Sequence, residues 1–255
     1  MMKSIRKKVL DGNVVSGTFL NLGSSLTTEI AGKSGFDWLL VDLEHGSGDF
    51  SELVHQLQAA GSTPAAPIVR IAWNESPRFK RVLDLGPSGV MVPYVNNADQ
   101  AKQAAKAMRY PPHGMRGVAS FNRACGYGQN FEQYFATANE QLLTVVQIET
   151  SEAVNRADEI AAVDGVDVLF VGPTDLSVSL GFPRKLDHPD FEAAITKVVA
   201  ACRKKGKAAG ILLSKPDQLE QTVSRGFTFI GMGSDGSVLS EGMARIASAY
   251  EKFRK

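Results

Sequence analysis

Short apolar segments alternate with amphipathic segments along the chain. Four apolar segments begin at or near a glycine that ends the preceding amphipathic stretch: GFDWLLVD (35–42), SGVMVPYV (88–95), GVDVLFVG (165–172) and GFTFIGMG (226–233). Glycine suits the left-handed position just past a helix C-terminus, and a continuous apolar run is typical of a strand buried on both faces. Four more runs complete a set of eight predicted strands: VVSGTFL (14–20), APIVRIA (66–72), LLTVVQIE (142–149) and KAAGILL (207–213).

The amphipathic segments have helical periodicity and supply a helix for each strand. They cover residues 24–35, 50–61, 76–86, 97–110, 151–163, 188–206, 215–226 and 236–253. Eight alternating strand–helix pairs predict an α/β protein with one TIM (β/α)₈ barrel, a fold of about 250 residues. The alternative, an open doubly wound sheet, usually has fewer strands and a G-x-G-x-x-G turn, which GTFLNLGSS does not contain. We expect a single domain over residues 1–255, with loop insertions at about 110–140 and 173–187.

The composition narrows the class of protein. The 28 basic and 27 acidic residues give a net charge of +1, which argues against a nucleic-acid or membrane-surface partner. The two cysteines, Cys125 and Cys202, are far apart and without metal-ligand spacing, so we expect free thiols in a reducing compartment. No secretory signal and no run of about 18 apolar residues is found. These features predict a soluble cytoplasmic protein that acts on small molecules.

Two carboxylates follow neighbouring predicted strands. Glu149 ends the fifth strand, and Asp175 lies just beyond the sixth. In a parallel barrel the C-terminal strand ends form the active site, and two carboxylates there repel each other unless a proton or a cation lies between them. Hard oxygen ligands suit Mg²⁺ or Mn²⁺. The alternative is that Glu149 caps the helix beginning TSEA and Asp175 starts the helix DLSVSL. Position alone leaves both interpretations open.

Further ionisable residues follow the second and third strands. Arg70 lies in the apolar run APIVRIA and needs an anionic partner, since an unpaired buried charge is costly. We favour a substrate carboxylate as that partner, and a structural pair with Asp42 or Glu44 is the alternative. The segment VDLEHG places Asp42, Glu44 and His45 together at the rim. Histidine moves protons near neutral pH, so His45 is a candidate acid or base.

Loop residues complete the candidate site. The turn Gly172-Pro173-Thr174 follows the sixth strand, and backbone N–H groups of such a turn can hold a carboxylate or oxyanion. GMGSDG (231–236) resembles a phosphate cradle, but we favour a role in starting the final helix. None of the predicted strands contains an interior lysine, which disfavours Schiff-base chemistry and favours a metal as the electron sink.

The chain resembles the HpcH/HpaI aldolases, a family of metal-dependent class II pyruvate aldolases. The resemblance covers almost the whole chain. It rests on these motifs, in order and at the separations typical of the family: GFDWLLVDLEHG, PIVRIAWNES, RYPPHGMRGV, VVQIET and VDVLFVGPTDLS. The family includes 4-hydroxy-2-oxoheptanedioate aldolase and 2-dehydro-3-deoxyglucarate aldolase.

The resemblance implies a role for each candidate residue. Glu149 and Asp175 correspond to the metal ligands, with Mg²⁺, Mn²⁺ or Co²⁺ as the cofactor. Arg70 corresponds to the residue that binds the pyruvyl group and stabilises its enolate. His45 corresponds to the acid/base group that serves the aldehyde half, and Asp84 to an aspartate regarded as the partner of that histidine.

Other positions are assigned by the same resemblance. Gly172, Pro173 and Thr174 would line the pyruvate pocket together with Asp175, and Asp42 and Glu44 would shape the water shell of the metal. The aldehyde would bind beside residues 120–130, which vary in this family. The family also implies a homohexamer, a trimer of dimers, in which the final helix packs against a neighbouring subunit.

The predicted function is reversible aldol cleavage of a 4-hydroxy-2-oxo acid to pyruvate and an aldehyde, in the catabolism of aromatic compounds or sugar acids. The base would be either His45 or a water on the metal. Alternatives are oxaloacetate decarboxylation, another enolate-forming lyase on the same barrel, and a non-catalytic carboxylate sensor. Retention of the metal-ligand carboxylates, Arg70 and His45 together argues against the sensor.

Overall fold

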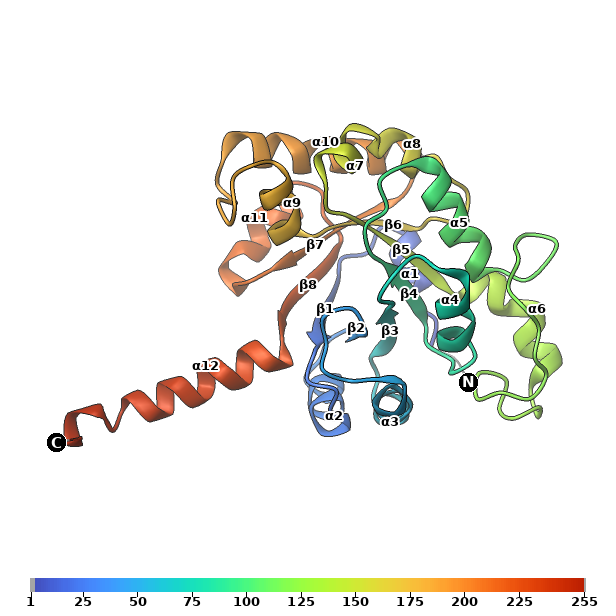
Figure 1. The fold of residues 1–255 in the computed structure, drawn as a ribbon, viewed down its shortest axis with the longest axis horizontal. Coiled ribbons are helices and arrows are strands. Elements are labelled where there is room, and N and C mark those ends of the chain that lie inside the picture. The colour runs from blue at the N-terminus through green and yellow to red at the C-terminus, as the bar shows by residue number, and fades with distance from the viewer. Residues whose placement is uncertain (1–2, 255) are drawn as a thin grey trace.

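All eight predicted strands form in the computed structural model, which describes residues 3–254. They pair in parallel and in chain order, and β1 pairs with β8 to close the barrel (Figure 1). The strands are β1 (Val15–Leu20), β2 (Trp38–Asp42), β3 (Ala66–Arg70), β4 (Gly89–Val92), β5 (Leu143–Ile148), β6 (Val168–Val171), β7 (Ala208–Leu213) and β8 (Phe229–Ser234). The predicted (β/α)₈ barrel is therefore confirmed.

Helices form close to the predicted segments, and all of them except α12 lie around the barrel (Figure 1). They are α2 (Ser25–Lys33), α3 (Phe50–Gly61), α4 (Ser76–Leu83), α5 (Ala98–Met108), α7 (Ser151–Asn155), α8 (Ala157–Ala161), α10 (Pro189–Lys205), the 3₁₀ turn η1 (Pro216–Gln218) with α11 (Leu219–Ser224), and α12 (Asp235–Ser248) with the 3₁₀ turn η2 (Glu251–Phe253). The predicted helix 151–163 is broken at Arg156 into α7 and α8. Gly35, Gly165 and Gly226 have φ of +101°, +90° and +104°, the left-handed conformation expected between a helix and the next strand.

Three helices lie outside the eight strand–helix pairs. α1 (Arg6–Leu10) precedes the first strand, α6 (Phe131–Gln141) lies within the first insertion, and α9 (Pro173–Ser179) opens the second. The apolar pattern does not predict α1 or α6. α9 is the short helix considered in the alternative interpretation of Asp175.

The barrel interior is filled by every second side chain of the strands, as a parallel barrel requires. Ile5 and Val9 bring α1 into the same cluster, so α1 closes the N-terminal end of the barrel. Trp38 stacks on Phe229 with ring centroids 4.4 Å apart. A side chain at Gly17 would overlap the Trp38 indole, so this glycine makes room for the largest interior ring. A second cluster fills the layer between strands and helices.

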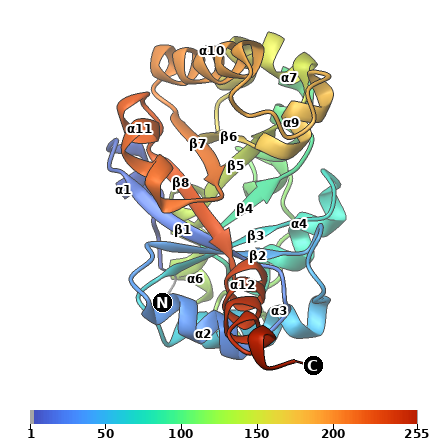
Figure 2. The ribbon, with the colours of Figure 1, turned by 90° about the vertical axis from the view of Figure 1, so that its left-hand side faces the viewer.

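Helix α12 does not return to the barrel wall. It follows β8 and extends away from the rest of the molecule (Figure 1), and in Figure 2 it points toward the viewer. None of its residues is buried. Its exposed apolar side chains, with those of the segment that follows it, are Val238, Leu239, Met243, Ile246, Tyr250 and Phe253. Among residues 3–254, no helix is both long and apolar enough to cross a membrane.

Candidate active site

The alternation of strand side chains brings the predicted polar residues into the barrel mouth. Leu40 and Ile68 point inward, so Asp42 and Arg70, two residues further along, point inward one layer higher. These two residues are direct partners in the β2–β3 register. Val145 on β5 points inward as well, and the same alternation carries Gln147 and Glu149 to the same side. Three strands, β2, β3 and β5, thus end in a layer of polar side chains above the apolar core.

The Arg70 guanidinium is the centre of this layer. Its Nε and Nη2 donate to the two carboxylate oxygens of Asp42 at 2.8 and 2.6 Å, a bidentate pair. Its Nη1 lies 2.9 Å from Oε2 of Glu44 and 3.5 Å from Oε1 of Gln147. The Nη1–Oε2 approach lacks hydrogen-bond geometry, and that Glu44 oxygen is buried without a donor. The structural pair considered for Arg70 therefore exists, and Nη1 is the part of the fork that Asp42 leaves uncommitted.

Glu149 is not the cap of the following helix. Thr150 is the N-cap of α7, and its hydroxyl accepts from the Ala153 N–H at 3.0 Å. The Glu149 carboxylate is buried and accepts from the Gln147 side-chain amide, and the backbone N–H of Tyr94 lies near it. A Cβ on Gly172 would lie 2.8 Å from Glu149 Oε1, so that glycine leaves the space the carboxylate occupies. The helix-cap interpretation of Glu149 is therefore wrong.

The electrostatics of the mouth reflect several acids gathered in a confined space. Burial, reinforced by the charges of Glu44 and Asp175, raises the pKa of Glu149 to about 8. Burial also raises the pKa of Glu44, in spite of the nearby Arg70 charge. For Asp42, burial opposes ionisation, but the Arg70 hydrogen bonds and charge outweigh it and lower the pKa. Asp42 and Glu44 share the single Arg70 cation, so the acids of the mouth exceed the positive charge beside them.

Asp175 lies in the first turn of α9. The N-cap of this helix is Gly172, and no side chain caps it. Pro173 is buried, whereas Thr174 is exposed and Asp175 half-buried. Helices leave their first N–H groups without intrahelical partners, so this turn presents both free amides and the Asp175 carboxylate. The charge of Asp175 acts on both Glu149 and Glu44, which places the residue with the acids of the mouth.

His45 lies at the outer rim. Its side chain is 68% exposed, and its Nε2 is 3.9 Å from Oε1 of Glu44. Its backbone N–H donates to Asp42 Oδ1 at 3.3 Å, so the turn after β2 is shaped by the same carboxylate that holds Arg70. The imidazole therefore faces solvent above the Arg70 layer.

Asp84 is not placed beside His45 in the single chain that the structure describes. It is the C-cap residue of α4, and its Oδ1 accepts from Arg116 Nη2 at 3.3 Å and Asn122 Nδ2 at 3.2 Å. Arg123 donates to the backbone oxygens of Leu85 and Leu57, near the C-terminal ends of α4 and α3. Helices after the strands run back toward the N-terminal end of a barrel, so residues 120–130 lie away from the mouth of their own chain.

Three contacts of the site are not predicted from the sequence. Gln147 bridges Arg70 and Glu149, and its position two residues before Glu149 on one strand face is the signal that could have found it. The centroid of the Phe19 ring lies 5.4 Å from Arg70 Cζ, a cation–π contact. The sequence does not predict it, because an aromatic residue in an apolar strand is equally expected to pack in the core. Tyr94 contacts Glu149 through its backbone, which no side-chain pattern can indicate.

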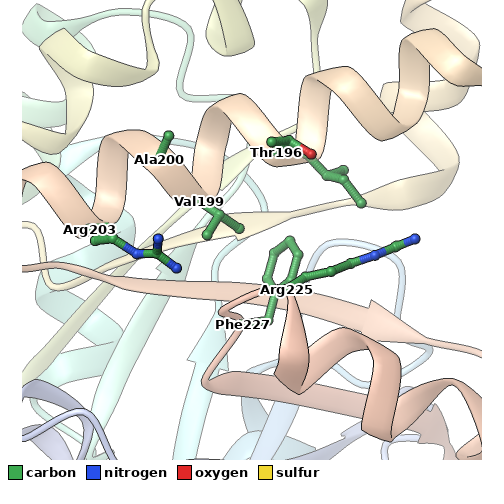
Figure 3. A pocket seen from close by; sticks show the side chains of 7 residues that line it. Thr196, Val199, Ala200, Arg203, Arg225 and Phe227 are labelled. Atoms are coloured by element: carbon green, nitrogen blue, oxygen red, sulfur yellow. The ribbon is translucent and has the colours of Figure 1, made fainter.

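A separate groove lies outside the barrel, between α10 and the turn after α11 (Figure 3). Its volume is about 280 Å³, and it contains none of the predicted site residues. It is lined by Ile195, Thr196, Val199, Ala200, Arg203, Arg225 and Phe227. Arg225 is already paired with Glu192 at 2.9 Å. We therefore place the candidate site at the barrel mouth.

Fold and site together define a class of protein. A closed (β/α)₈ barrel with ionisable side chains at the C-terminal strand ends is the arrangement of a barrel enzyme. The family model described as HpcH/HpaI aldolase/citrate lyase matches residues 15–242, and the chain belongs to this family.

Individual relatives span nearly the whole chain. A 4-hydroxy-2-oxo-heptane-1,7-dioate aldolase of Escherichia coli is 36% identical over 250 residues, covering 98% of this chain and 95% of its own. A 2-keto-3-deoxy-L-rhamnonate aldolase of Escherichia coli O157:H7 is 39% identical over 239 residues, covering 93% and 89%. The crystal structure of a family protein from Burkholderia cenocepacia J2315 matches with a TM-score of 0.93 at 34% identity, covering 97% of this chain and 99% of its own. Aldolases are carbon–carbon lyases, and the chain is an enzyme of that class.

Proposed function

We propose that this enzyme catalyses reversible aldol cleavage of a 4-hydroxy-2-oxo acid to pyruvate and an aldehyde. The observation that carries the proposal is the inward-facing layer in which Asp42 holds Arg70 beside the buried Glu149. This layer offers a fixed cation next to more acids than its single charge can balance. Such a layer suits a reaction in which negative charge develops on a bound 2-oxo acid.

Glu149 and Asp175 would hold a divalent cation. Two features of the site fit such an ion: the pKa of Glu149 is raised to about 8 by burial and neighbouring acids, and a Glu44 oxygen is buried without a donor. Among the described residues, no three His, Cys, Asp or Glu side chains form a metal-holding group, so water and substrate would supply the remaining ligands. A bound divalent ion would supply Lewis-acid stabilisation of the enolate. Mg²⁺, Mn²⁺ and Co²⁺ are the candidates.

Arg70 would bind the pyruvyl half. Asp42 occupies Nε and Nη2 and so fixes the plane of the guanidinium. Nη1 lies 2.9 Å from Glu44 Oε2 without hydrogen-bond geometry, and its one hydrogen bond is a long contact of 3.5 Å to Gln147. A substrate oxygen could replace that contact and gain a charge-assisted hydrogen bond. When the C3–C4 bond breaks, its electron pair passes into the enolate of pyruvate, and Arg70 stabilises the negative charge that develops on the C2 oxygen.

His45 would serve the aldehyde half. Its exposed imidazole at the rim, near Glu44, can accept the C4 hydroxyl proton as the bond breaks. The proton reaches the imidazole nitrogen, the C4 oxygen becomes the aldehyde carbonyl, and a proton added at C3 completes pyruvate. The first turn of α9, Gly172 to Thr174, would line the pocket. Its free amide is the N–H of Thr174, which would face the pyruvate carboxylate, because Pro173 has no N–H and the Gly172 N–H donates to the Ile148 backbone oxygen at 3.4 Å. Asp84 would act on His45 only if another subunit brought the two together.

The test is release of pyruvate from a panel of 4-hydroxy-2-oxo acids with aldehyde halves of different length and charge. Arg70→Ala should lower kcat/KM by roughly 100-fold or more, the usual cost of removing a group that stabilises developing charge. Arg78→Ala is the matched control, because Arg78 is exposed and paired with Glu75. Normal turnover by Arg70→Ala would refute the assignment. Oxaloacetate decarboxylation without aldol cleavage would instead identify a decarboxylase.

The same proposal extends to assembly and location. An exposed apolar helix that buries nothing in its own chain fits the homohexamer, a trimer of dimers, implied by the family resemblance, with α12 packed against a neighbour. Cys125 and Cys202 are both free and buried, which suits the reducing cytoplasm.

A further inference from the structure

Two exposed aromatic side chains stand at the barrel mouth without an assigned role. Trp73 follows β3, three residues after Arg70, and Tyr94 follows β4. Their ring centroids are 6.0 Å apart with an interplanar angle of 32°. Trp73 is 50% exposed and Tyr94 38% exposed. Large aromatic side chains are usually more buried than this, and an exposed pair at the mouth of a site is a candidate binding surface.

The Tyr94 backbone is held in an unusual conformation. Its φ is +52°, in the left-handed region that bulky residues rarely adopt. Neighbouring contacts fix this loop to the end of β5. The Val95 N–H donates to the Gln147 backbone oxygen at 3.3 Å, and Asn96 Oδ1 accepts from Thr150 Oγ1 at 2.5 Å. Such conformations persist where surrounding contacts over-determine them, often at functional sites.

The Tyr94 ring is close to the acids of the site. The charges of Asp175, Glu149 and Glu44 act on its phenol, which places the ring near these acids. The phenol hydroxyl can donate a hydrogen bond. The aromatic pair thus lies beside the same carboxylates that flank Arg70, on the side of the mouth formed by the loops after β3 and β4.

The chemistry of this pair favours one kind of ligand. Aromatic faces pack against C–H groups, and the phenol O–H and indole N–H can bond to hydroxyl groups. Neither side chain carries a positive charge that could pair with a carboxylate. We infer that Trp73 and Tyr94 form a wall that receives the aldehyde half of the substrate and selects an uncharged, hydroxylated fragment over a carboxylate-terminated one. This inference rests on the proposed aldol cleavage.

The experiment compares two substrates in the full-length enzyme. The kcat/KM for 2-keto-3-deoxy-L-rhamnonate, whose aldehyde half is hydroxylated and uncharged, is divided by that for 4-hydroxy-2-oxoheptanedioate, whose aldehyde half ends in a carboxylate. Trp73→Leu and Tyr94→Asn should each lower this ratio about tenfold or more. Asparagine tolerates a positive φ, so Tyr94→Asn removes the ring while keeping the backbone conformation and its N–H. Tyr250→Phe, at an exposed tyrosine beyond α12, is the control and should leave the ratio unchanged.

Deuterium exchange into the methyl group of pyruvate provides a reference that needs no aldehyde. If a variant still catalyses the exchange and its substrate ratio is that of the wild type, the wall is overturned. If a variant loses the exchange, the substrate ratio is measured instead in Tyr94→Phe and Trp73→Phe, which keep aromatic rings. A ratio about threefold lower than that of the wild type in either of these two variants supports the wall. Wild-type ratios in both variants overturn it. Absence of exchange in the wild-type enzyme would overturn the proposed function instead.

Discussion

At the scale of single residues, Glu149 is a carboxyl group whose ionised form is destabilised by its surroundings. A carboxyl group buried beside two other acids prefers to be protonated, which is the reason for its pKa of about 8. Proteins rarely retain such a group without a function that requires it. Asp42 shows the contrasting case, because two hydrogen bonds from Arg70 keep it ionised in an equally buried position.

The raised pKa predicts how stability depends on pH in metal-free enzyme. The folded protein holds the Glu149 proton up to about pH 8, whereas the unfolded chain releases it near 4.5. The favourable contribution is therefore complete below about pH 4.5 and is lost as the pH rises through 8. The free energy of unfolding in chelator should fall by on the order of a few kcal/mol over this window.

Denaturant titrations at several pH values measure this slope, and Glu149→Gln provides the comparison. The variant should lose most of it. Burial also raises the pKa of Glu44, so a smaller dependence of stability on pH should remain in Glu149→Gln. An equal slope in wild type and Glu149→Gln would show that Glu149 is not the titrating group.

A second residue-scale prediction concerns Gly172. A Cβ there would approach Oε1 and Cγ of Glu149 to 2.8 and 2.9 Å, so Gly172→Ala should displace the carboxylate. We expect pyruvate release to fall at least about tenfold, the cost of misplacing a catalytic group by a fraction of an ångström. Gly61→Ala is the control, because a Cβ at that position meets nothing within 4 Å. Unchanged activity in Gly172→Ala would argue against a role for the Glu149 position.

At the scale of elements, the N-terminal helix α1 is fastened to the barrel floor by a buried ion pair. Arg6 donates through Nε and Nη2 to both oxygens of Asp167, each at 2.9 Å. Asp167 also accepts from the Thr144 N–H at 2.9 Å, so the pair joins α1 to the starts of β5 and β6. Ile5 and Val9 add the apolar contact that closes the barrel.

Removing this pair should destabilise the fold. Arg6→Ala leaves the buried Asp167 carboxylate without its cation and should lower the free energy of unfolding by about 3 kcal/mol. Lys7→Ala removes an exposed pair with Asp11 from the same helix and should cost less than about 0.5 kcal/mol. Equal losses in the two variants, measured by denaturant unfolding, would contradict the account of α1.

The elements that the sequence predicts are those whose apolar pattern is long and regular. α3 forms over the predicted residues 50–61, because its apolar stripe faces the barrel and Asp49 caps its start. α1 has only five residues, too few to show a helical period of apolar positions. Its burial depends on packing against the N-terminal end of the barrel, which the sequence pattern does not indicate. The break between α7 and α8 contains no proline or glycine, so the sequence does not predict it.

The candidate site was predictable to the extent that strand ends define it. Glu149, Arg70 and Asp42 meet because alternation along parallel strands sends them to one side. Asp84 was assigned by resemblance alone, and its place at the end of α4 depends on tertiary contacts with Arg116 and Asn122. The backbone of Tyr94 depends likewise on the neighbouring strand and not on its own side chain.

At the scale of the whole molecule, the exposed apolar side chains of α12 predict that the chain forms an oligomer. An exposed apolar stripe of this kind is stable in water when another surface covers it. Light scattering should give the mass of an oligomer for the wild type, and Leu239→Glu combined with Ile246→Glu should give a smaller species. Glu241→Gln, on the same helix, should leave the mass unchanged. A monomeric wild-type protein would refute this use of α12.

The central claim is that a divalent cation held by Glu149 and Asp175 acts with Arg70 to form the enolate of pyruvate. Deuterium exchange into the pyruvate methyl group, followed by NMR before and after chelation, tests it most directly. Exchange should fall to background after metal removal and return when Mg²⁺, Mn²⁺ or Co²⁺ is added, but not in Glu149→Gln. Full exchange in thoroughly metal-free enzyme would contradict the account.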